Sequence, residues 1–148
     1  MYKILVIGDN PNRAILANSL LCTGLPSILQ LQTPEHYLFM ASDAIDLVIQ
    51  DVVTHYLNRK AKKRDLMLTE RIVNDINNSR NHIPLVLVSD SQRIGELADY
   101  IPKLNKLDSG KFSVIQRGIN PVPLVTLVNR ILRGEQFKQH AEQQYGAL

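Results

Sequence analysis

The fold class of this 148-residue chain follows from one stretch, Asp46-Leu47-Val48-Ile49-Gln50-Asp51-Val52-Val53. Its apolar centre, residues 47–49, lies between an acid and the polar pair Gln50-Asp51. Such a run, with helical segments before and after it, predicts a strand buried on both faces of a parallel sheet. Asp51 would stand at the carboxyl end of that strand, the edge at which open α/β sheets bind ligands. On this octet alone, however, the simpler interpretation is that Asp51 ends the strand, because Asp is a common turn residue.

Length and composition fit a single globular domain with a full core, since 45% of the residues are hydrophobic. No apolar run approaches the roughly 20 residues of a membrane-spanning helix, and the first residues lead directly into a strand. The single cysteine, Cys22, lies in an apolar helical stretch. We therefore expect it to be a small core residue, in a protein of the reducing cytoplasm.

The net charge of +3 is local and not distributed over the chain. Five positive charges fall between Arg59 and Arg64, so the rest of the chain carries a small net negative charge. We interpret this segment as part of a polar, basic loop over residues 55–65. A nucleic-acid binder that uses residues 59–64 is a remote alternative, because aromatic residues are scarce there and no recognition helix is evident.

Outward from the central stretch, apolar runs alternate with helical patterns along the chain. We expect further strands at residues 3–7, 27–31, 84–88 and 112–115. Helices are predicted over residues 11–23, 34–42, 66–78, 94–101 and 120–133, with Asn10 as the N-cap of the first. This alternation predicts an α/β fold, doubly wound around a five-stranded parallel sheet in the strand order 2-1-3-4-5. The domain would cover residues 1–134, and residues 135–148 would form a polar tail or extend the last helix.

Polar residues stand at the carboxyl ends of four of these strands and would meet at one edge of the sheet. They are Asp9, Asp51, Ser89 and Arg117, with Asp90 next to Ser89. Two carboxylates at one edge repel each other unless a cation or a proton lies between them. Magnesium is the natural cation, since it is held by one or two carboxylates together with water and phosphate oxygens. A hydroxyl and a fixed positive charge beside them can hold a phosphoryl group.

Four segments, in this order, resemble the receiver domain of two-component response regulators over nearly the whole chain. They are ILVIGDNPNR (residues 4–13), DLVIQDVV (46–53), PLVLVS (84–89) and VIQRGINPVPL (114–124). The resemblance implies a flavodoxin-like fold and a role in phosphorelay signal transduction, with a histidine kinase or another signalling protein as the partner. It implies no enzymatic activity beyond transfer of a phosphoryl group to the domain's own aspartate.

The family's phosphorylation site maps onto residues of this chain. The resemblance implies that Asp51 is the phosphoacceptor and attacks the phosphoryl group of a phosphohistidine by in-line displacement. Magnesium would be held by Asp9, Asp51 and the backbone carbonyl of Val53. Ser89 would bond a phosphoryl oxygen, and Arg117 would replace the lysine that pairs with the acceptor.

Several residues depart from the family's pattern, in which two adjacent acids follow the first strand. Gly8 replaces the first of these acids and removes a negative charge from the metal site, so we expect weak or no magnesium binding. Arg117 carries a planar fork on a longer stem than lysine, and it can form a permanent bidentate pair with Asp51. Asp90 adds an acid beside the hydroxyl, and Val114 replaces an aromatic residue that switches position on activation.

Two interpretations of function follow from these residues. The first is an atypical or pseudo-receiver that acts through protein contacts, with weak or absent phosphorylation of Asp51. The alternative is a working phosphoacceptor that takes phosphate from a histidine kinase with magnesium. We favour the first, and we expect Arg117 or a cation of residues 59–64 to substitute partly for magnesium. Self-association through the last strand and last helices is a further prediction, based on Val125 and Leu132 beside the buried stripe of the last helix.

Overall fold

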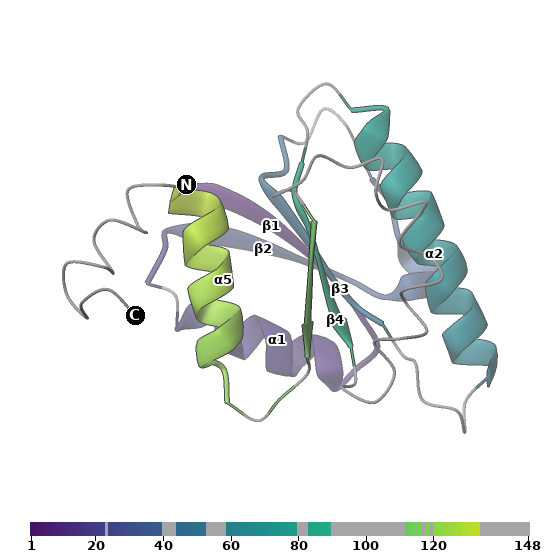
Figure 1. The fold of residues 1–148 in the computed structure, drawn as a ribbon, viewed down its shortest axis with the longest axis horizontal. Coiled ribbons are helices and arrows are strands. Elements are labelled where there is room, and N and C mark those ends of the chain that lie inside the picture. Colours follow the sequence, from purple (N-terminus) through teal and green to yellow (C-terminus); the bar gives the residue numbers. More distant parts are fainter. Residues whose placement is uncertain are drawn as a thin grey trace.

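The computed structural model describes residues 1–22, 24–39, 44–52, 59–79, 83–89, 112–116, 118 and 120–133. Within them, five parallel strands form one sheet in the order β2-β1-β3-β4-β5 (Figure 1). The strands are β1 (Tyr2–Ile7), β2 (Ser27–Gln32), β3 (Leu47–Asp51), β4 (Leu85–Ser89) and β5 (Phe112–Gln116). The predicted strand order, 2-1-3-4-5, is therefore confirmed, and with it the doubly wound α/β fold.

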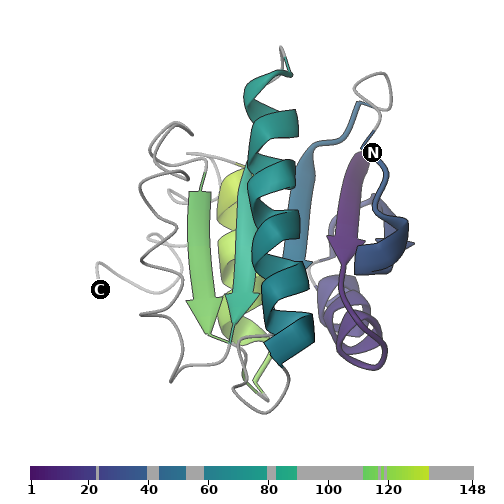
Figure 2. The ribbon, with the colours of Figure 1, turned by 90° about the vertical axis from the view of Figure 1, so that its right-hand side faces the viewer.

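Helices cover both faces of the sheet (Figures 1 and 2). Helices α1 (Asn12–Leu21) and α5 (Val122–Arg133) lie on one face, and α2 (Arg59–Asn77) lies on the other. A short 3-10 turn, η1 (Pro34–His36), follows β2. This placement divides the core into two layers, which we call the α1/α5 layer and the α2 layer.

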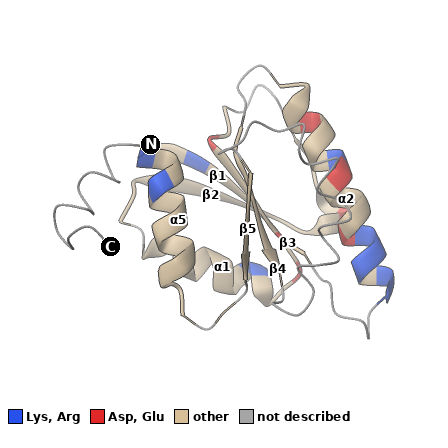
Figure 3. Cartoon of the chain, viewed as in Figure 1, with Lys and Arg blue, Asp and Glu red and all other residues tan. Residues whose placement is uncertain are grey.

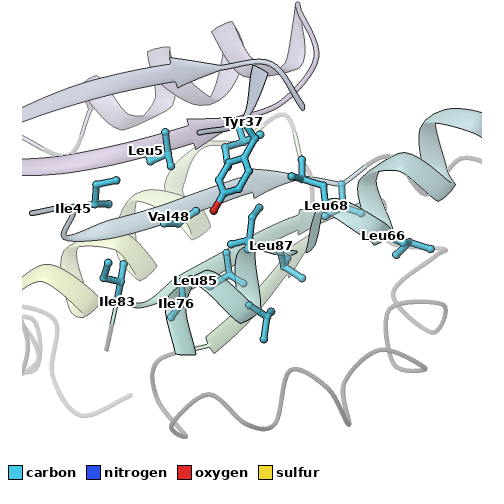
Figure 4. Close-up of a cluster of buried hydrophobic side chains, with 14 residues drawn as sticks. Leu5, Tyr37, Ile45, Val48, Leu66, Leu68, Ile76, Ile83, Leu85 and Leu87 are labelled. Carbon is cyan, nitrogen blue, oxygen red and sulfur yellow. The ribbon is translucent and has the colours of Figure 1, made fainter. Parts of the chain in front are cut away.

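The central strands supply side chains to both layers, because successive residues of a strand point to opposite faces. In β3, Val48 packs in the α2 layer, whereas Leu47 and Ile49 pack in the α1/α5 layer. Every residue of β3 and of β4 is buried. Figure 4 shows the α2 layer, where side chains of α2 meet those of β1, β3 and β4. Burial on both faces explains why these strands have continuous apolar runs in the sequence.

Helix α2 begins earlier than predicted from the sequence. We expected a loop over residues 55–65 and a helix from Leu66, but one continuous helix runs from Arg59 to Asn77. Ala61 and Asp65 are buried, and they continue the buried face of Leu68 toward the start of the helix. Lysine and arginine are good helix formers, so the charges between these positions do not interrupt the helix. The basic residues 59–64 therefore belong to a helix and not to a loop.

Three smaller predictions are also wrong. The helix expected over residues 34–42 is the 3-10 turn η1, whose three residues are followed by irregular backbone up to residue 39. Helix α1 starts at Asn12 with Pro11 in the N-cap position, and within the described residues no side chain caps it, so Asn10 is not the cap. Cys22, expected in the core, is exposed, because it follows the last residue of α1 and lies beyond the buried positions of that helix.

Some predictions fall outside the described residues. Residues 40–43 and 53–58 hold the end of the helix predicted over 34–42 and the start of the loop predicted over 55–65. The helix predicted over 94–101, the domain boundary at residue 134 and the tail at 135–148 also lie outside the described residues. In the part of the chain that the structure describes, no helix has both the length and the apolar character needed to cross a membrane.

Candidate functional site

Three of the predicted site residues lie at the carboxyl ends of neighbouring strands. Asp9 follows β1, Asp51 ends β3 and Ser89 ends β4. These strands are adjacent in the sheet, in that order. Asp51 and Ser89 are buried, with 1% and 0% of their surface exposed. The three described residues thus lie at the same edge of the sheet, and their chemical roles stay predictions.

Gly8 lies directly against Asp51 at this edge. A Cβ atom on Gly8 would come within 3.0 Å of the Cβ atom of Asp51, closer than nearly all contacts that Cβ atoms make in proteins. Gly8 is itself buried, and its N–H donates to the carbonyl of Gln32 at 3.1 Å. An acid at this position, as in the receiver pattern, would therefore have to displace Asp51 or the end of β1.

Arg64 of α2 binds the acidic residue that follows β1. Its Nη2 atom lies 2.6 Å from Oδ2 of Asp9, although the two residues are 55 positions apart in the sequence. Its Nη1 atom donates to Oε1 of Glu35 at 2.5 Å, and Nη2 lies 2.9 Å from Oδ1 of Asp65. One guanidinium therefore joins carboxylates from the turn after β1, from η1 and from α2. Charge-assisted hydrogen bonds of this kind are stronger than neutral ones.

The pKa values of Arg64 and Glu35 are both shifted in the direction that favours the charged form. Partial burial acts to lower the pKa of Arg64, but the hydrogen bonds to Asp9 and Asp65 and their negative charges outweigh it, so the pKa is raised. A backbone hydrogen bond lowers the pKa of Glu35. Burial acts against this, and the charge of Arg64 lowers the pKa of Glu35 further. Both shifts favour the charged forms of Arg64 and Glu35 at neutral pH.

A buried hydrogen-bond network fixes α2 against β3, next to Asp51. The side-chain amide of Gln50 donates to the backbone carbonyl of Asp65 at 3.2 Å. The hydroxyl of Thr69 lies 2.8 Å from both Oε1 of Gln50 and the same carbonyl oxygen. Because buried polar groups require hydrogen-bond partners, this network constrains the turn of α2 that carries Arg64.

Two described residues at this edge differ from the magnesium site of the receiver pattern. Gly8 offers no side-chain ligand, and Asp9 is paired with Arg64, which a divalent cation would have to displace. Within the described ranges, no group of three or more His, Cys, Asp or Glu side chains is arranged to hold a metal ion. Magnesium can be held by one or two carboxylates with water, so Asp9 and Asp51 are the described residues that would hold it.

Sequence reasoning identified the acids of this edge but missed most of the residues that engage them. A cation of residues 59–64 was expected to reach the acids, and Arg64 does so, from a helix and not from a loop. Nothing in the sequence pointed to Glu35 or Gln50 as its supports. The remaining predicted or weighed site residues lie outside the described residues: Val53, Asp90 and Arg117.

No family model matches the chain, and no curated protein sequence is detectably similar to it. Solved structures do resemble it. NtrX from Brucella abortus is 20% identical, with a TM-score of 0.62 over 97% of this chain and 30% of that one. A CheY-like response regulator receiver domain protein from Methanospirillum hungatei is 15% identical, with a TM-score of 0.61 over 95% of this chain and 98% of that one. Response regulator protein TrrA from Thermotoga maritima, in complex with Mg²⁺ and BeF, is 22% identical, with a TM-score of 0.57 over 89% of this chain and 100% of that one.

These similarities establish the fold. The chain has the fold of response regulator receiver domains, and it spans less than a third of the NtrX chain. A shared fold does not carry function, which has to be argued from the residues of the site.

Proposed function

We propose that this domain is an atypical receiver, a signalling module that acts through protein contacts and not through phosphorylation of Asp51. The observation that carries the proposal is the ion pair between Arg64 and Asp9, at 2.6 Å. In the receiver pattern Asp9 would be a metal ligand, and phosphoryl transfer depends on metal ions to neutralise developing charge. An arginine on that carboxylate supplies positive charge without the open coordination positions of a metal.

Two further features support the proposal. A side chain at Gly8, where the receiver pattern has an acid, would press against Asp51. The same guanidinium is also held by Glu35 and by Asp65, whose side chain is fully buried. A metal at Asp9 would therefore compete with an arginine that other carboxylates keep in place.

The partner that fits this proposal is a histidine kinase or another signalling protein. We also propose that the domain binds a second copy of itself through β5 and α5. We place the domain in the cytoplasm, where a chain with a single cysteine stays reduced. Basic residues gather at the start of α2 (Figure 3), but Arg64 among them is committed to the acidic cluster. That commitment weakens the case for a nucleic-acid surface, which depends on freely available positive charge.

A working phosphoacceptor is the second candidate. Asp51 and Ser89 are buried at the ends of adjacent strands, and the structural neighbour TrrA binds Mg²⁺ and BeF. Under this candidate Asp51 would accept a phosphoryl group from a phosphohistidine, after the pair between Arg64 and Asp9 had opened. Transfer of the phosphoryl group from the phosphohistidine to its own Asp51 would be the only reaction that the domain carries out.

The two candidates differ in their response to magnesium. We expect millimolar magnesium to leave the melting temperature of the wild type unchanged, because only a ligand that binds the folded state raises it. Arg64→Ala frees Asp9, so its melting temperature should rise with magnesium, whereas the double variant Arg64→Ala/Asp9→Ala should not respond. Lys63→Ala removes the neighbouring exposed cation and is the matched control, which should behave as the wild type.

Intact mass after incubation with acetyl phosphate and magnesium is the second measurement. We expect little or no added phosphate on the wild type and none on Asp51→Asn. Rapid, stoichiometric labelling of the wild type would overturn the proposal in favour of the phosphoacceptor. So would a magnesium-dependent rise in melting temperature that Asp9→Ala abolishes.

A further inference from the structure

The exposed face of α2 carries basic residues around one apolar side chain. We call this set the α2 stripe, and its members are Lys60, Lys63, Met67 and Arg71. All four are exposed and recur every three or four positions, so they lie along one side of the helix, opposite its buried face. At 1.5 Å per residue the stripe is about 16 Å long. Arg71 also lies over the ring of Tyr37, 5.2 Å from its centroid.

The lysines of the stripe are not neutralised by the fold. Within the part of the chain that the structure describes, neither Lys60 nor Lys63 has a carboxylate partner, whereas Arg64 beside them has three. The nearest acids of α2 do not belong to the stripe, because Asp65 is fully buried and Glu70 lies partly buried beside it. The charge of the two lysines therefore faces solvent and is available to a partner.

This charge is also unfavourable for the helix that carries it. Lys60 lies in the first turn of α2, where the helix dipole is positive, and no acid in that turn offsets it (Figure 3). Residues that oppose a local rule of stability are expected where they serve a function. A contact outside the domain therefore explains the positive charge of the stripe better than the fold does.

Met67 distinguishes between classes of partner. It is 62% exposed, and it lies between Lys63 and Arg71 at the centre of the stripe. Methionine and arginine are enriched in protein interfaces, where the flexible methionine side chain adapts to the opposite surface. A surface for single-stranded nucleic acid would have aromatic side chains that stack on bases, and a helix that lies on a membrane would have a wide apolar face. The stripe has neither feature, so its composition favours a protein.

We propose that the α2 stripe binds an acidic helix of a partner protein, with an apolar side chain of that helix on Met67 and its carboxylates next to the basic residues. A helix fits because its side chains recur at the same three- and four-residue spacing as those of the stripe. The inference rests on the proposed function, since it names the chemistry of the partner that the domain contacts. Its test uses no phosphodonor and no magnesium. Failure of the acidic helix to bind would therefore leave the phosphorylation and magnesium experiments unaffected.

Three synthetic helical peptides of about 15 residues, a length that covers the stripe, test the proposal. The first has Glu on both sides of a central Leu, the second has Gln in place of every Glu, and the third has Gln in place of the central Leu. Titration of the isotope-labelled chain, followed by NMR, should give saturable shifts at the amides of Lys63 and Met67 with the first peptide. We expect the second and the third to bind more weakly. The proposal is overturned if the first peptide gives no saturable shifts there, or if the second binds as tightly as the first.

A pair of double variants separates the stripe from general attraction between charges. Lys60→Gln/Lys63→Gln should weaken the first peptide about tenfold, the combined effect of two exposed ion pairs. Arg130→Gln/Arg133→Gln is the matched control, because it removes the same charge from exposed positions in the last turn of α5. The control should bind the peptide as the wild type does. Equal weakening in the two double variants would show that net charge attracts the peptide, and would overturn the proposal.

Met67→Gln tests the apolar centre of the stripe. It should weaken the first peptide and remove its advantage over the third, whereas Leu21→Gln, at a position of α1 that is 73% exposed, should change neither. A DNA duplex of about 15 base pairs tests the nucleic-acid alternative, since it offers phosphate charge without an apolar contact. The proposal is overturned if Met67→Gln binds the first peptide as the wild type does. It is also overturned, in favour of a nucleic-acid surface, if the duplex binds more tightly than the peptide at the same salt concentration.

Discussion

Arg64 is the residue whose removal should be felt most widely, because its guanidinium contacts carboxylates on three segments. Asp65, one of its partners, is fully buried and would lose a hydrogen-bonded cation. We expect Arg64→Ala to lower the free energy of unfolding by about 1–3 kcal/mol. Arg64→Lys should recover only part of this, since an ammonium group cannot reproduce the planar fork. Urea unfolding measures both variants, and an equal loss in Lys63→Ala would show that the cluster is not responsible.

Gly8 lies against Asp51, so packing limits the side chain that this position can carry, and Gly8→Ala tests this limit. The new Cβ atom would lie 3.0 Å from that of Asp51, so we expect the free energy of unfolding to fall by about 1–3 kcal/mol, as in other overpacked cores. Gly118→Ala is the matched control, because the nearest described atom to its Cβ would be the backbone nitrogen of Asn120, at 4.0 Å. Its stability should lie within about 0.5 kcal/mol of the wild type. Equal stability of the two variants would contradict the close contact.

Tyr37 should make the fold sensitive to alkaline pH. Burial raises the pKa of its phenol, and the hydrogen bond to Oδ2 of Asp75, at 2.8 Å, raises it further. Arg71, whose guanidinium lies 5.2 Å from the ring centroid, lowers the pKa but does not offset these effects. The folded chain therefore keeps a proton that the unfolded chain releases above about pH 10. The contribution of this proton to stability is complete below that pH and is lost as the pH rises beyond it.

Tyr37→Phe measures this contribution. Near pH 8 the variant should unfold more easily than the wild type by about 1 kcal/mol, because it lacks the hydrogen bond to Asp75. Near pH 11 the difference should shrink or change sign, since only the wild type then has to keep a proton on the phenol. Chemical denaturation at the two pH values provides the comparison. A difference that is constant with pH would show that the phenol titrates normally.

For single residues, a position that depends on the local sequence pattern could be predicted, whereas a position that depends on tertiary packing could not. Asp9, Asp51 and Ser89 could be placed because each follows an apolar strand, and the ends of parallel strands share one edge. The pair of Arg64 and Asp9 joins residues 55 positions apart. Its geometry depends on how α2 lies on the sheet, which no local pattern of residues records.

At the scale of elements, α2 begins with positive charge at the end where the helix dipole is also positive. Its first turn has no acid, and basic residues occupy most of its first six positions. We expect Lys60→Glu to raise the free energy of unfolding by about 0.3–1 kcal/mol. Asn74→Glu, in the last turn, should lower it by a similar amount, because a negative charge there opposes the dipole. Both positions are exposed, so urea unfolding should report opposite signs, and a shared sign would exclude the dipole as the cause.

The strands could be predicted from the sequence and the start of α2 could not, because the two elements are buried differently. Strands β3 and β4 are buried on both faces, so each begins with a continuous apolar run, and polar residues occur only toward the carboxyl end. Helix α2 needs one buried face, and in its first turns that face consists of Ala61 and Asp65. Neither residue marks a buried face in a sequence. Asp65 is buried with the guanidinium of Arg64, its neighbour in the chain, as a charged partner, and the same guanidinium also binds Asp9 and Glu35, which lie far away in the sequence.

At the scale of the whole molecule, the sheet separates two environments on either side of Asp51. On the α2 face, Gln50 binds the helix turn whose Arg64 neutralises Asp9. On the other face, Asp51 borders a cavity between α1 and α5. The strand order alone brings these environments to one edge, which is why the edge was predictable. The partner of each acid depends on the packing of whole helices, which the sequence did not reveal.

Self-association through β5 and α5 is a prediction about the whole molecule. The structure indicates a better residue to mutate in its test than the one chosen from the sequence. Leu132, chosen from the sequence, packs against the α1/α5 layer, so Leu132→Glu would disturb folding as well as any interface. Val122 of α5 is 59% exposed and avoids this problem. A dimer with twofold symmetry buries the same surface on both copies, so Val122→Glu would bring two carboxylates into one apolar contact.

Light scattering at micromolar concentration should therefore give twice the monomer mass for the wild type and the monomer mass for Val122→Glu. Ile28→Glu is the matched control, because Ile28 is 50% exposed on β2, at the opposite edge of the described sheet from β5. It introduces the same charge at a similar apolar position and should leave the dimer intact. A strictly monomeric wild type would remove the interface from the proposal. A dimer that both variants disrupt equally would show that charge, and not this surface, controls association.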